Sequence, residues 1–371
     1  MNHQNNFDLL RLFAACQVVY LHASGHLGLP KGGILFDVVT QFQGVAVFFV
    51  ISGFLVSDSY LRNQDISSFL FKRALRIYPA LIVNILVLEL AYGATGGLAT
   101  TAWAYGKYLS VYLVTASGHF ANLAFGGSPT YTKSWFFPWY PSGVLWTLTV
   151  ELSFYLVLPL VLALVARARI LGATILFCLM AGSFIISTQA TFEFYAAHPS
   201  LNELIVPYFW IFGIGVAARV WWDAIAKLFE DKALWWLAIC STLTYISVSV
   251  FNGRAYLEYK IAPDFLVCIR TIVMACTVLS AAFTARHLAS ILRGNDLSYG
   301  LYLWHMLIVT SLVALNLRGH WWLWIIVYGL GFALAAASWF FVEKPALRLK
   351  GRSAFVTVLA PESPTHFRME R

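Results

Sequence analysis

Charged side chains are scarce in this chain. Lys, Arg, Asp and Glu together make up 11% of the 371 residues, whereas hydrophobic types make up 60% and the mean hydropathy is +0.72. Soluble domains carry about 25% charged residues. The scarcity of charge therefore excludes an ordinary soluble domain and indicates a protein that crosses a membrane several times.

Strand-length segments that alternate polar and apolar residues are also lacking, as are internal repeats and low-complexity linkers. Long unbroken apolar runs recur instead, which favours membrane-spanning helices over a β-barrel. Windows of about 20 apolar residues predict an all-α polytopic bundle of about ten spans. The predicted spans fall near residues 8–27, 42–61, 77–97, 144–166, 169–188, 204–222, 233–251, 264–284, 297–316 and 321–341.

Cysteine is rare, and the sequence lacks several familiar signals. The five cysteines are odd in number, include no C-x-x-C pair and fall in apolar stretches, so we expect buried thiols rather than disulfides. No metal-ligand pattern, phosphate loop or hydrolase elbow is present. The N-terminus lacks a basic region and a small-residue cleavage site, so the first span is expected to be retained. The absence of an N-x-S/T sequon agrees with a bacterial inner membrane.

Acidic residues are fewer than basic ones, with 17 Asp and Glu against 25 Lys and Arg, so the net charge is +8. The basic residues gather in alternate loops rather than on one stripe, which argues against a nucleic-acid partner. With the N-terminus in the cytoplasm, 18 Lys and Arg fall on that side and 6 on the other, and Arg270 inside a span completes the 25. This asymmetry predicts that both termini are cytoplasmic. We expect a membrane domain over residues 1–350 and a polar cytoplasmic tail over 351–371.

One long loop, near residues 98–143, is rich in Trp, Tyr and Phe interleaved with Gly and Pro. Loops of this length are usually functional or disordered, and the aromatic content disfavours disorder. Two interpretations stay open. The loop forms an interfacial aromatic belt, with a helix near 102–116 lying along the membrane, or it forms a lid or sugar-stacking wall over an outward-facing cavity.

Arg11 and His22 are the most informative residues of the first predicted span. Their spacing turns the helix about 20° beyond three full turns, so they share one face, about 16 Å apart along the axis. Ionisable groups inside a bilayer are costly and mark functional sites, and this spacing suggests one elongated ligand that touches both. In the simpler interpretations, His22 only bridges two helices by a hydrogen bond, and Asp8 forms a local ion pair with Arg11.

Arg73 and Arg76 are three residues apart, so they project from one helical face where the third span enters the bilayer. Planar guanidinium groups suit a phosphate clamp. The alternative is simple anchoring of the span by positive charge. In the predicted topology, Arg11, Arg73 and Arg76 all lie on the cytoplasmic side, where together they would hold a phosphorylated ligand.

Glu151 lies inside the fourth span, with Thr147 one turn earlier on the same face. A buried carboxylate must be paired or protonated. We expect Glu151 to receive a hydrogen bond from His22 or to orient an incoming hydroxyl, and a purely structural role is the alternative. His305, Thr147 and Ser52 are candidate site-lining residues, although packing would also explain His305.

Glycines in the second span favour close helix packing as the first interpretation of Gly44 and of the Ser52-Gly53 pair. Arg270, within the eighth span, needs a partner that the sequence does not identify.

Six short motifs occur in order along nearly the whole chain. Arg11 and His22, with ten residues between them, resemble the first-helix motif of the acyltransferase-3 family of integral inner-membrane acyltransferases. Further segments are similar to later motifs of that family: 44–55, 73–79, 145–151, 297–305 and 341–345. Thr147 stands where the family usually has serine, and the threonine side chain retains the hydroxyl group.

The resemblance implies transfer of an acyl group from cytoplasmic acyl-coenzyme A to a hydroxyl of a cell-surface or exported carbohydrate. Acetyl is the expected group and succinyl the alternative. Acyl-coenzyme A would be a co-substrate rather than a permanently bound cofactor, and the bilayer and the glycan would be the partners.

The resemblance also implies roles for individual residues. His22 would be general base or transient acyl carrier, assisted by Glu151, and the arginines would bind the donor. The alternative class is a transporter or flippase, in which buried charges line a substrate path without covalent chemistry.

Overall fold

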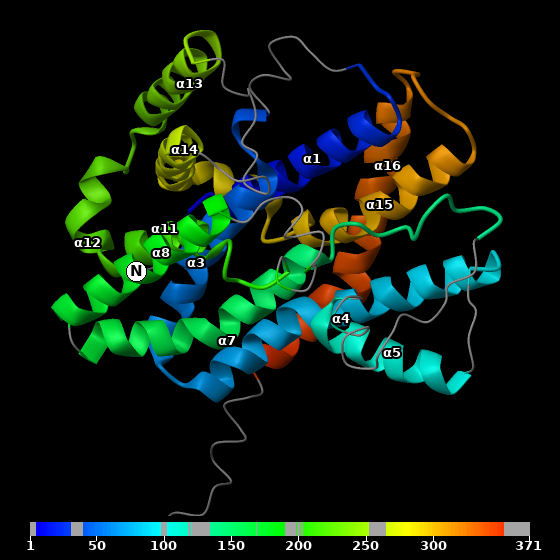
Figure 1. Ribbon diagram of the computed structural model, residues 1–371, viewed down its shortest axis with the longest axis horizontal. Coiled ribbons are helices and arrows are strands. Elements are labelled where there is room, and N and C mark those ends of the chain that lie inside the picture. The colour runs from blue at the N-terminus through cyan, green and yellow to red at the C-terminus, as the bar shows by residue number, and fades with distance from the viewer. Residues whose placement is uncertain are drawn as a thin grey trace, which may run out of the picture.

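The computed structural model describes residues 5–30, 40–97, 102–117, 134–167, 169–189, 203–251 and 265–351, with residues 120, 198 and 201. Within these ranges the regular elements are all helical, which confirms the all-α class (Figure 1). The α-helices are α1 (Phe7–His26), α3 (Gly44–Asn63), α4 (Ile66–Ala94), α5 (Ala102–Thr115), α7 (Trp146–Arg167), α8 (Arg169–Gln189), α11 (Phe209–Val220), α12 (Trp222–Ile225), α13 (Ala233–Ser249), α14 (Phe265–Ala282), α15 (Ser298–Ala314), α16 (Leu323–Ser338) and α17 (Lys344–Arg348).

Each of the ten predicted span regions contains one of these helices. In the part of the chain that the structure describes, six helical segments are long and apolar enough to cross a membrane: α3, α4, α7, Ile170–Thr188 of α8, α14 and Leu323–Arg348. A seventh arises if α11 and the bent segment Trp222–Leu228, at 79° to it, count as one span. Ten spans and cytoplasmic termini remain predictions. The proposed tail, apart from Gly351, lies outside the described residues.

The helix that carries Arg73 and Arg76 begins earlier than predicted. α4 starts at Ile66 rather than near residue 77, because the Asp65 carboxylate accepts hydrogen bonds from the backbone N–H groups of Ser67 (3.2 Å) and Ser68 (2.9 Å). Such a cap satisfies donors that would otherwise be unpaired at the first turn. Both arginines therefore lie well inside a helix. The helix predicted near 102–116 is found as α5.

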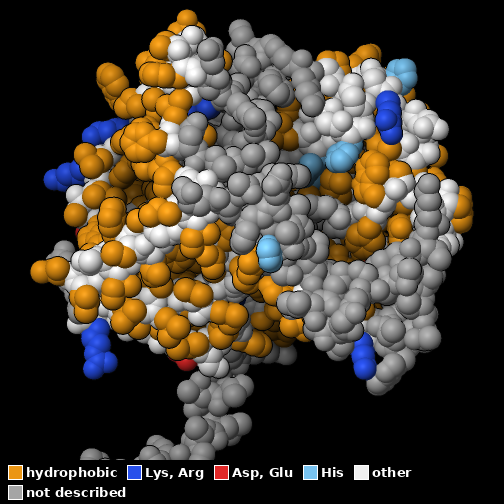
Figure 2. All heavy atoms as spheres, in the orientation of Figure 1, with side chains coloured by type: hydrophobic (Ala, Val, Ile, Leu, Met, Phe, Trp, Pro, Cys, Tyr) orange, Lys and Arg blue, Asp and Glu red, His pale blue; other side chains and the backbone are white. Residues whose placement is uncertain are grey.

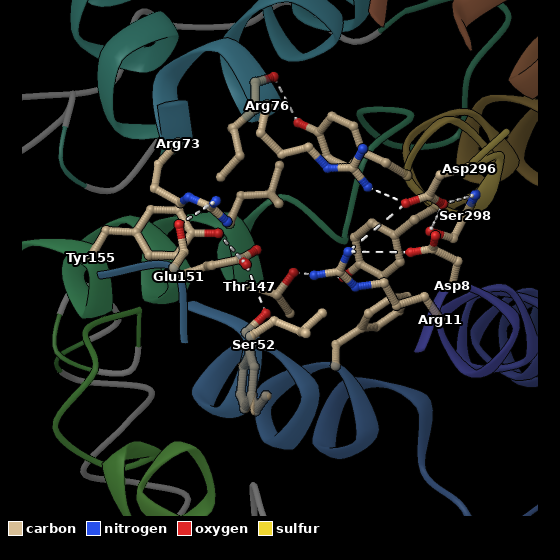
Figure 3. A pocket seen from close by; sticks show the side chains of 18 of the residues that line it. Asp8, Arg11, Ser52, Arg73, Arg76, Thr147, Glu151, Tyr155, Asp296 and Ser298 are labelled. Carbon is tan, nitrogen blue, oxygen red and sulfur yellow. Dashed lines mark hydrogen bonds and ion pairs between the residues drawn. The ribbon is translucent and has the colours of Figure 1, made fainter. Parts of the chain in front are cut away.

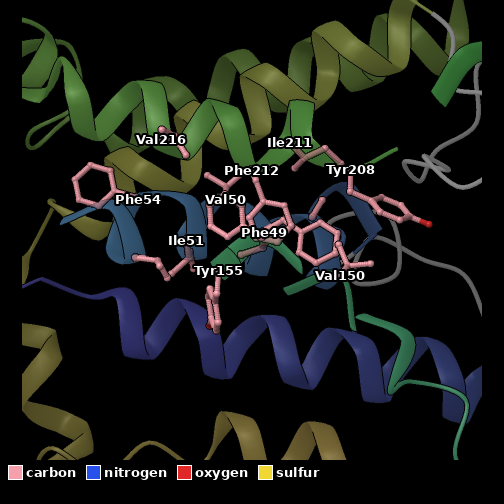
Figure 4. Close-up of a cluster of buried hydrophobic side chains, with 14 of the residues drawn as sticks. Phe49, Val50, Ile51, Phe54, Val150, Tyr155, Tyr208, Ile211, Phe212 and Val216 are labelled. Carbon is pink, nitrogen blue, oxygen red and sulfur yellow. The ribbon is translucent and has the colours of Figure 1, made fainter. Parts of the chain in front are cut away.

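Helix α3 packs closely against α11, with large rings of α3, α7 and α11 around the contact (Figure 4). A Cβ atom added to Gly53 would lie 2.2 Å from the carbonyl oxygen of Phe212, and one added to Gly215 would lie 2.1 Å from that of Val50. Neither position leaves room for a side chain. The close-packing interpretation of the glycines in the second span is confirmed.

Helix α3 also begins directly against α1. The backbone N–H of Gly44 donates a 2.7 Å hydrogen bond to the Gln17 side chain, and a Cβ atom on Gly44 would lie 2.3 Å from the Ala14 carbonyl oxygen. Gln17 and Ala14 both lie between Arg11 and His22 in the α1 sequence. The start of α3 is therefore wedged between the two ionisable residues of the first span.

The outer surface is largely apolar. In Figure 2, hydrophobic side chains cover much of the described face, with Lys and Arg at its margins. α13 packs on α14 at one edge of the bundle and α5 on α4 at another (Figure 1). α8 also exposes large side chains such as Phe177, 72% exposed, and Cys178 is exposed rather than buried as expected, because it shares this surface. The five cysteines are free thiols.

Candidate active site

A cavity of about 350 Å³ lies where α1, α3, α4, α7 and α15 meet (Figure 3). We call it the arginine cavity. Among its lining residues are Asp8, Arg11, Val45, Phe48, Ser52, Arg62, Arg73, Arg76, Thr147, Glu151, Tyr155, Asp296, Tyr302 and Lys350. The structure thus brings together all three predicted donor-binding arginines with Glu151, Thr147 and Ser52.

Acidic side chains face two of the three arginines. Arg76 donates a hydrogen bond to Asp296, and Arg11 lies 3.9 Å from both Asp296 and Asp8. Burial alone would raise the pKa of the Asp296 carboxyl, but the charges of Arg76 and Arg11 outweigh burial and lower this pKa to about 2. Asp296 is therefore a stable anion that holds both guanidinium groups at the cavity wall. The Asp8–Arg11 ion pair, one of the interpretations of Arg11 from the sequence, is thus present beside the contact with Asp296.

Arg73 has weaker partners. Its Nη2 atom donates to the Ser59 hydroxyl at 3.3 Å, while its Nε atom is buried with no hydrogen-bond partner among the described residues. Lys350 lies at the same end of the cavity. Burial, followed by the charges of Arg73, Arg76, Arg11 and Lys72, lowers the pKa of Lys350 to about 8. This end of the cavity, which we call the arginine end, therefore combines several basic side chains with a guanidinium group, that of Arg73, that has donor capacity for an anion.

Glu151 lies on the α7 wall of the cavity. Its Oε1 atom accepts hydrogen bonds from the Ser52 hydroxyl at 2.9 Å and from the Tyr155 hydroxyl at 2.5 Å. Figure 3 shows Arg73 on the side of this cluster opposite Ser52. The carboxylate is therefore held by neighbouring hydroxyls and faces the space between the arginines and Thr147.

His22 pairs with the second histidine that the sequence singled out. The Nδ1 atom of His22 lies 2.9 Å from Nε2 of His305, and the two rings stack with their centroids 5.2 Å apart. The Nδ1 atom of His305 lies 2.8 Å from the backbone carbonyl oxygen of Tyr302. The structure therefore joins α1 to α15 through a histidine pair.

This geometry fixes the positions of the protons in an uncharged pair. A carbonyl oxygen only accepts, so Nδ1 of His305 carries a hydrogen and its Nε2 is an acceptor. His305 is wholly buried, where the uncharged ring is favoured. His22 must then donate from Nδ1, and its Nε2 atom is left unprotonated. An imidazole in this tautomer can take a proton at Nε2.

The histidine pair and the arginine cavity are separate places in the structure. Among the described residues, the lining of the cavity includes Tyr302 and Thr147 but neither His22 nor His305. One elongated ligand that touches both Arg11 and His22, as the helix spacing suggested, would have to pass the side chains at the end of the cavity. His22 is separated from the cavity because the start of α3 packs against α1 between Arg11 and His22.

A row of rings continues from His22 on the side away from the cavity. The His26 ring lies 6.2 Å from the His22 ring, and the Trp139 ring lies 5.3 Å from that of His26. Trp139 belongs to the described part of the long aromatic loop and is 37% exposed. Residues 98–101, 118–119 and 121–133 of that loop lie outside the described ranges.

Sequence reasoning missed several residues of the site. Tyr155 is one helical turn after Glu151, a spacing that could have identified it. Asp296 lies just ahead of α15, where its Oδ1 accepts a hydrogen bond from the Ser298 N–H at 3.0 Å, and nothing in the sequence linked it to the arginines. Tyr302 falls within the 297–305 motif but was not singled out, and Lys350 gave no signal, because only tertiary packing brings these residues to the cavity. Buried Arg270 lies 3.5 Å from the Ser247 hydroxyl on α13, away from the cavity lining.

Comparison with known proteins gives consistent matches. The family model described as an acyltransferase domain matches residues 4–343. Nodulation protein 10 of Rhizobium leguminosarum bv. viciae is 46% identical over 353 residues, which cover 94% of each chain. A peptidoglycan O-acetyltransferase of Listeria monocytogenes is 25% identical over 365 residues, covering 92% of this chain and 55% of its own. An O-acetyl transferase of Shigella phage Sf6 is 34% identical over 93 residues, 25% of this chain and 28% of its own.

No solved structure matches the chain. The family model nevertheless extends over most of the sequence, from just before α1 to the end of the helical segment Trp339–Glu343 that follows α16. The chain therefore belongs to the acyltransferase-3 family of membrane O-acyltransferases.

Proposed function

We propose that this protein transfers an acyl group from acyl-coenzyme A, held in the arginine cavity, to a carbohydrate hydroxyl, with His22 as general base. The observation that carries the proposal is the hydrogen-bonded chain from His22 through His305 to the Tyr302 carbonyl. It supports a His22 ring whose Nε2 can accept the proton of the attacking hydroxyl. His305 acts as a positioning residue, because it holds the tautomer and orientation of the base.

The arginine cavity suits the donor in both charge and length. Coenzyme A has a phosphate-rich nucleotide end and a long, largely uncharged pantetheine arm that ends in the thioester. Val45 and Arg62 both line the cavity and lie on α3 seventeen residues apart, which corresponds to about 26 Å along the helix. The phosphates would bind Arg11, Arg73 and Arg76, and the arm would extend toward Val45.

Glu151 is proposed to contact this arm. Its carboxylate lies between the arginine end and Thr147, with oxygen atoms that can accept hydrogen bonds from the two amide N–H groups of pantetheine. Glu151 would then assist catalysis by placing the thioester rather than by bonding to His22.

The proposed topology places the two substrates on opposite sides of the membrane. The positive-inside distribution puts the arginine end at the cytoplasmic face of a bacterial inner membrane, in a bundle of ten spans with cytoplasmic termini. His22 is half-buried, and its ring lies next to that of His26, which in turn lies next to the Trp139 ring. Aromatic faces are suited to sugar rings, so the acceptor would approach from this side.

The chemical step follows from these placements. The acceptor oxygen attacks the thioester carbonyl carbon while its proton passes to Nε2 of His22. The carbon–sulfur bond then breaks, an ester bond is left on the carbohydrate, and the proton goes to the leaving thiolate. The alternative, in which His22 transiently carries the acyl group, uses the same nitrogen as nucleophile. Acetyl is the expected group and succinyl the alternative.

Two variants test the function. Replacing His22 with Ala should abolish O-acetylation of the cell-surface polysaccharide, measured by mass spectrometry of cells that express the variant, while the purified variant still binds acetyl-coenzyme A. Replacing Arg73 with Ala should instead weaken acetyl-coenzyme A binding by about tenfold or more, since a hydrogen bond to a charged group is lost. His287→Ala and Arg167→Ala, at exposed positions away from the cavity, are the matched controls.

Each variant has a contrary outcome. Acetylation that survives in His22→Ala would overturn the catalytic assignment. An unchanged affinity for acetyl-coenzyme A in Arg73→Ala would reduce that arginine to an anchor of α4.

A further inference from the structure

We propose that Tyr302 and Thr147 close a barrier between the donor cavity and the histidine pair, and that this barrier makes the enzyme choose the acceptor hydroxyl over water. The barrier is formed by the buried cluster of Val18, Val144, Tyr302 and Met306, with Val45 and Phe48 packed against it. The inference deepens the proposed function and rests on it.

One face of the barrier is turned toward the arginine cavity and the other toward the histidine pair. Val45, Phe48 and Tyr302 line the arginine cavity. Val18 lies one helical turn before His22 on α1, and Met306 directly follows His305 on α15. Neither Val18 nor Met306 belongs to the cavity lining among the described residues, and both are at least 96% buried. Packed side chains therefore separate the end of the cavity from the two imidazoles.

A set of hydroxyl contacts holds the barrier shut. The Tyr302 hydroxyl lies 2.7 Å from the Thr147 hydroxyl and donates to the Val144 carbonyl oxygen at 3.0 Å, and Thr147 reaches the same carbonyl at 3.0 Å. The two hydroxyls have two protons for three contacts, so only two contacts are hydrogen bonds at one time. The Phe48 ring meets the Tyr302 ring edge to face, with centroids 5.7 Å apart.

Tyr302 connects the barrier to the base by two different groups. Its side chain closes the cavity, while its backbone carbonyl accepts from Nδ1 of His305. Rotation of the side chain can therefore open the passage without disturbing the carbonyl that sets the tautomer of the pair. A thioester arm that fills the cavity would displace the ring and reach His22.

The barrier has a chemical purpose. An activated base beside a thioester and water would catalyse hydrolysis, in which a water oxygen bonds to the carbonyl carbon, the carbon–sulfur bond breaks, and a free carboxylic acid and coenzyme A leave. A closed barrier keeps water of the acceptor side away from the thioester until the arm fills the passage. The ratio of hydrolysis to transfer is therefore the property that the barrier controls.

The test uses acetyl-coenzyme A as the probe with the purified full chain, and it measures release of coenzyme A without an acceptor. O-acetylation of the surface polysaccharide is measured in cells that express the same variants. Tyr302→Phe and Thr147→Val each remove one hydroxyl and keep most of the side-chain volume. We expect hydrolysis relative to transfer to rise about tenfold, the change that loss of one buried hydrogen bond produces.

Phe48→Leu loosens the barrier in a second way and should raise the same ratio. The matched control is Phe154→Leu, because Phe154 is fully buried against Phe212 but lies outside the cavity lining. Phe154→Leu should leave the ratio unchanged even where it lowers stability.

Two results would overturn the barrier. One is an unchanged ratio in all three barrier variants that still fold. The other is an equal fall in hydrolysis and transfer in Tyr302→Phe and Thr147→Val, which would mean that the hydroxyls stabilise the reacting carbonyl instead. Either result leaves the role of His22 intact, whereas transfer that survives in His22→Ala defeats the proposed function itself.

Discussion

At the scale of single residues, the proposed basicity of His22 depends on the ring that it touches. His305 accepts the Nδ1 hydrogen of His22 and is itself fixed by the Tyr302 carbonyl. Without an acceptor at that position, the unpaired Nδ1–H of His22 would favour the other tautomer or a rotated ring. The base would then present a proton to the acceptor instead of a lone pair.

The first prediction separates this positioning role from simple packing. His305→Ala should lower kcat for transfer by about 100-fold or more, in the range of one general base contribution, with little change in KM for acetyl-coenzyme A. His305→Gln places an amide oxygen near the former Nε2 atom and should restore part of the rate. Equal loss of kcat in Ala and Gln variants with unchanged thermal stability would contradict the tautomer argument.

Lys350 gives a prediction about pH. Its pKa in the unliganded protein is about 8, lowered by burial and by the neighbouring basic residues. A bound polyanion raises this pKa, so binding takes up a proton above pH 8, and affinity should be highest below pH 8 and fall as pH rises. Calorimetric titration with desulfo-coenzyme A, which has no thiol to ionise, measures the effect.

Two variants of Lys350 test whether this residue causes the pH dependence. Lys350→Arg stays charged and should bind equally well across the range, while Lys350→Met should bind weakly at every pH. If Lys350→Met keeps the pH dependence of the unmodified protein, another group is responsible and the assignment to Lys350 is wrong.

At the scale of helices, the positions of most helices along the chain could be predicted from the sequence, but the contacts between helices could not. The apolar runs located the helices, and the spacing of Arg73 and Arg76 placed both on one cavity wall. The spacing of Arg11 and His22 gave their shared helical face but not what packs between them, because helical periodicity does not show tertiary contacts. Among the described residues, Arg11 lines the cavity and His22 does not. The docking of Gly44 on Gln17 decides that point, and it is a tertiary contact.

The α3–α11 crossing provides the prediction at this scale. Gly215→Ala puts a Cβ atom 2.1 Å from the Val50 carbonyl oxygen, so the two helices must separate. We expect a loss of about 1–3 kcal/mol in stability, seen as a lower unfolding temperature in detergent. Gly182→Ala, on α8, meets nothing within 4 Å and should be neutral or slightly stabilising. Equal unfolding temperatures for both variants would contradict the close contact.

At the scale of the whole molecule, the proposed function requires that the arginine end face the cytoplasm and the His22 side face outward. Arg62, whose side chain is 66% exposed, marks the arginine end, and exposed Arg318, in the turn after α15, marks the other. In intact cells, a membrane-impermeant maleimide should label Arg318→Cys directly and Arg62→Cys only after permeabilisation, with the parent protein as background. The reverse pattern would place the donor cavity outside and contradict cytoplasmic acyl-coenzyme A as its ligand.

The most direct test of the central claim is an experimental structure of the protein with an acetyl-coenzyme A analogue in which the thioester sulfur is replaced by a methylene group. We expect the phosphates to lie within hydrogen-bond distance of Arg73 and Arg76, the Tyr302 ring to be displaced, and the acetyl carbonyl to lie beside Nε2 of His22. Phosphates bound elsewhere, or an acetyl group that ends far from His22 in a fully occupied site, would contradict this claim.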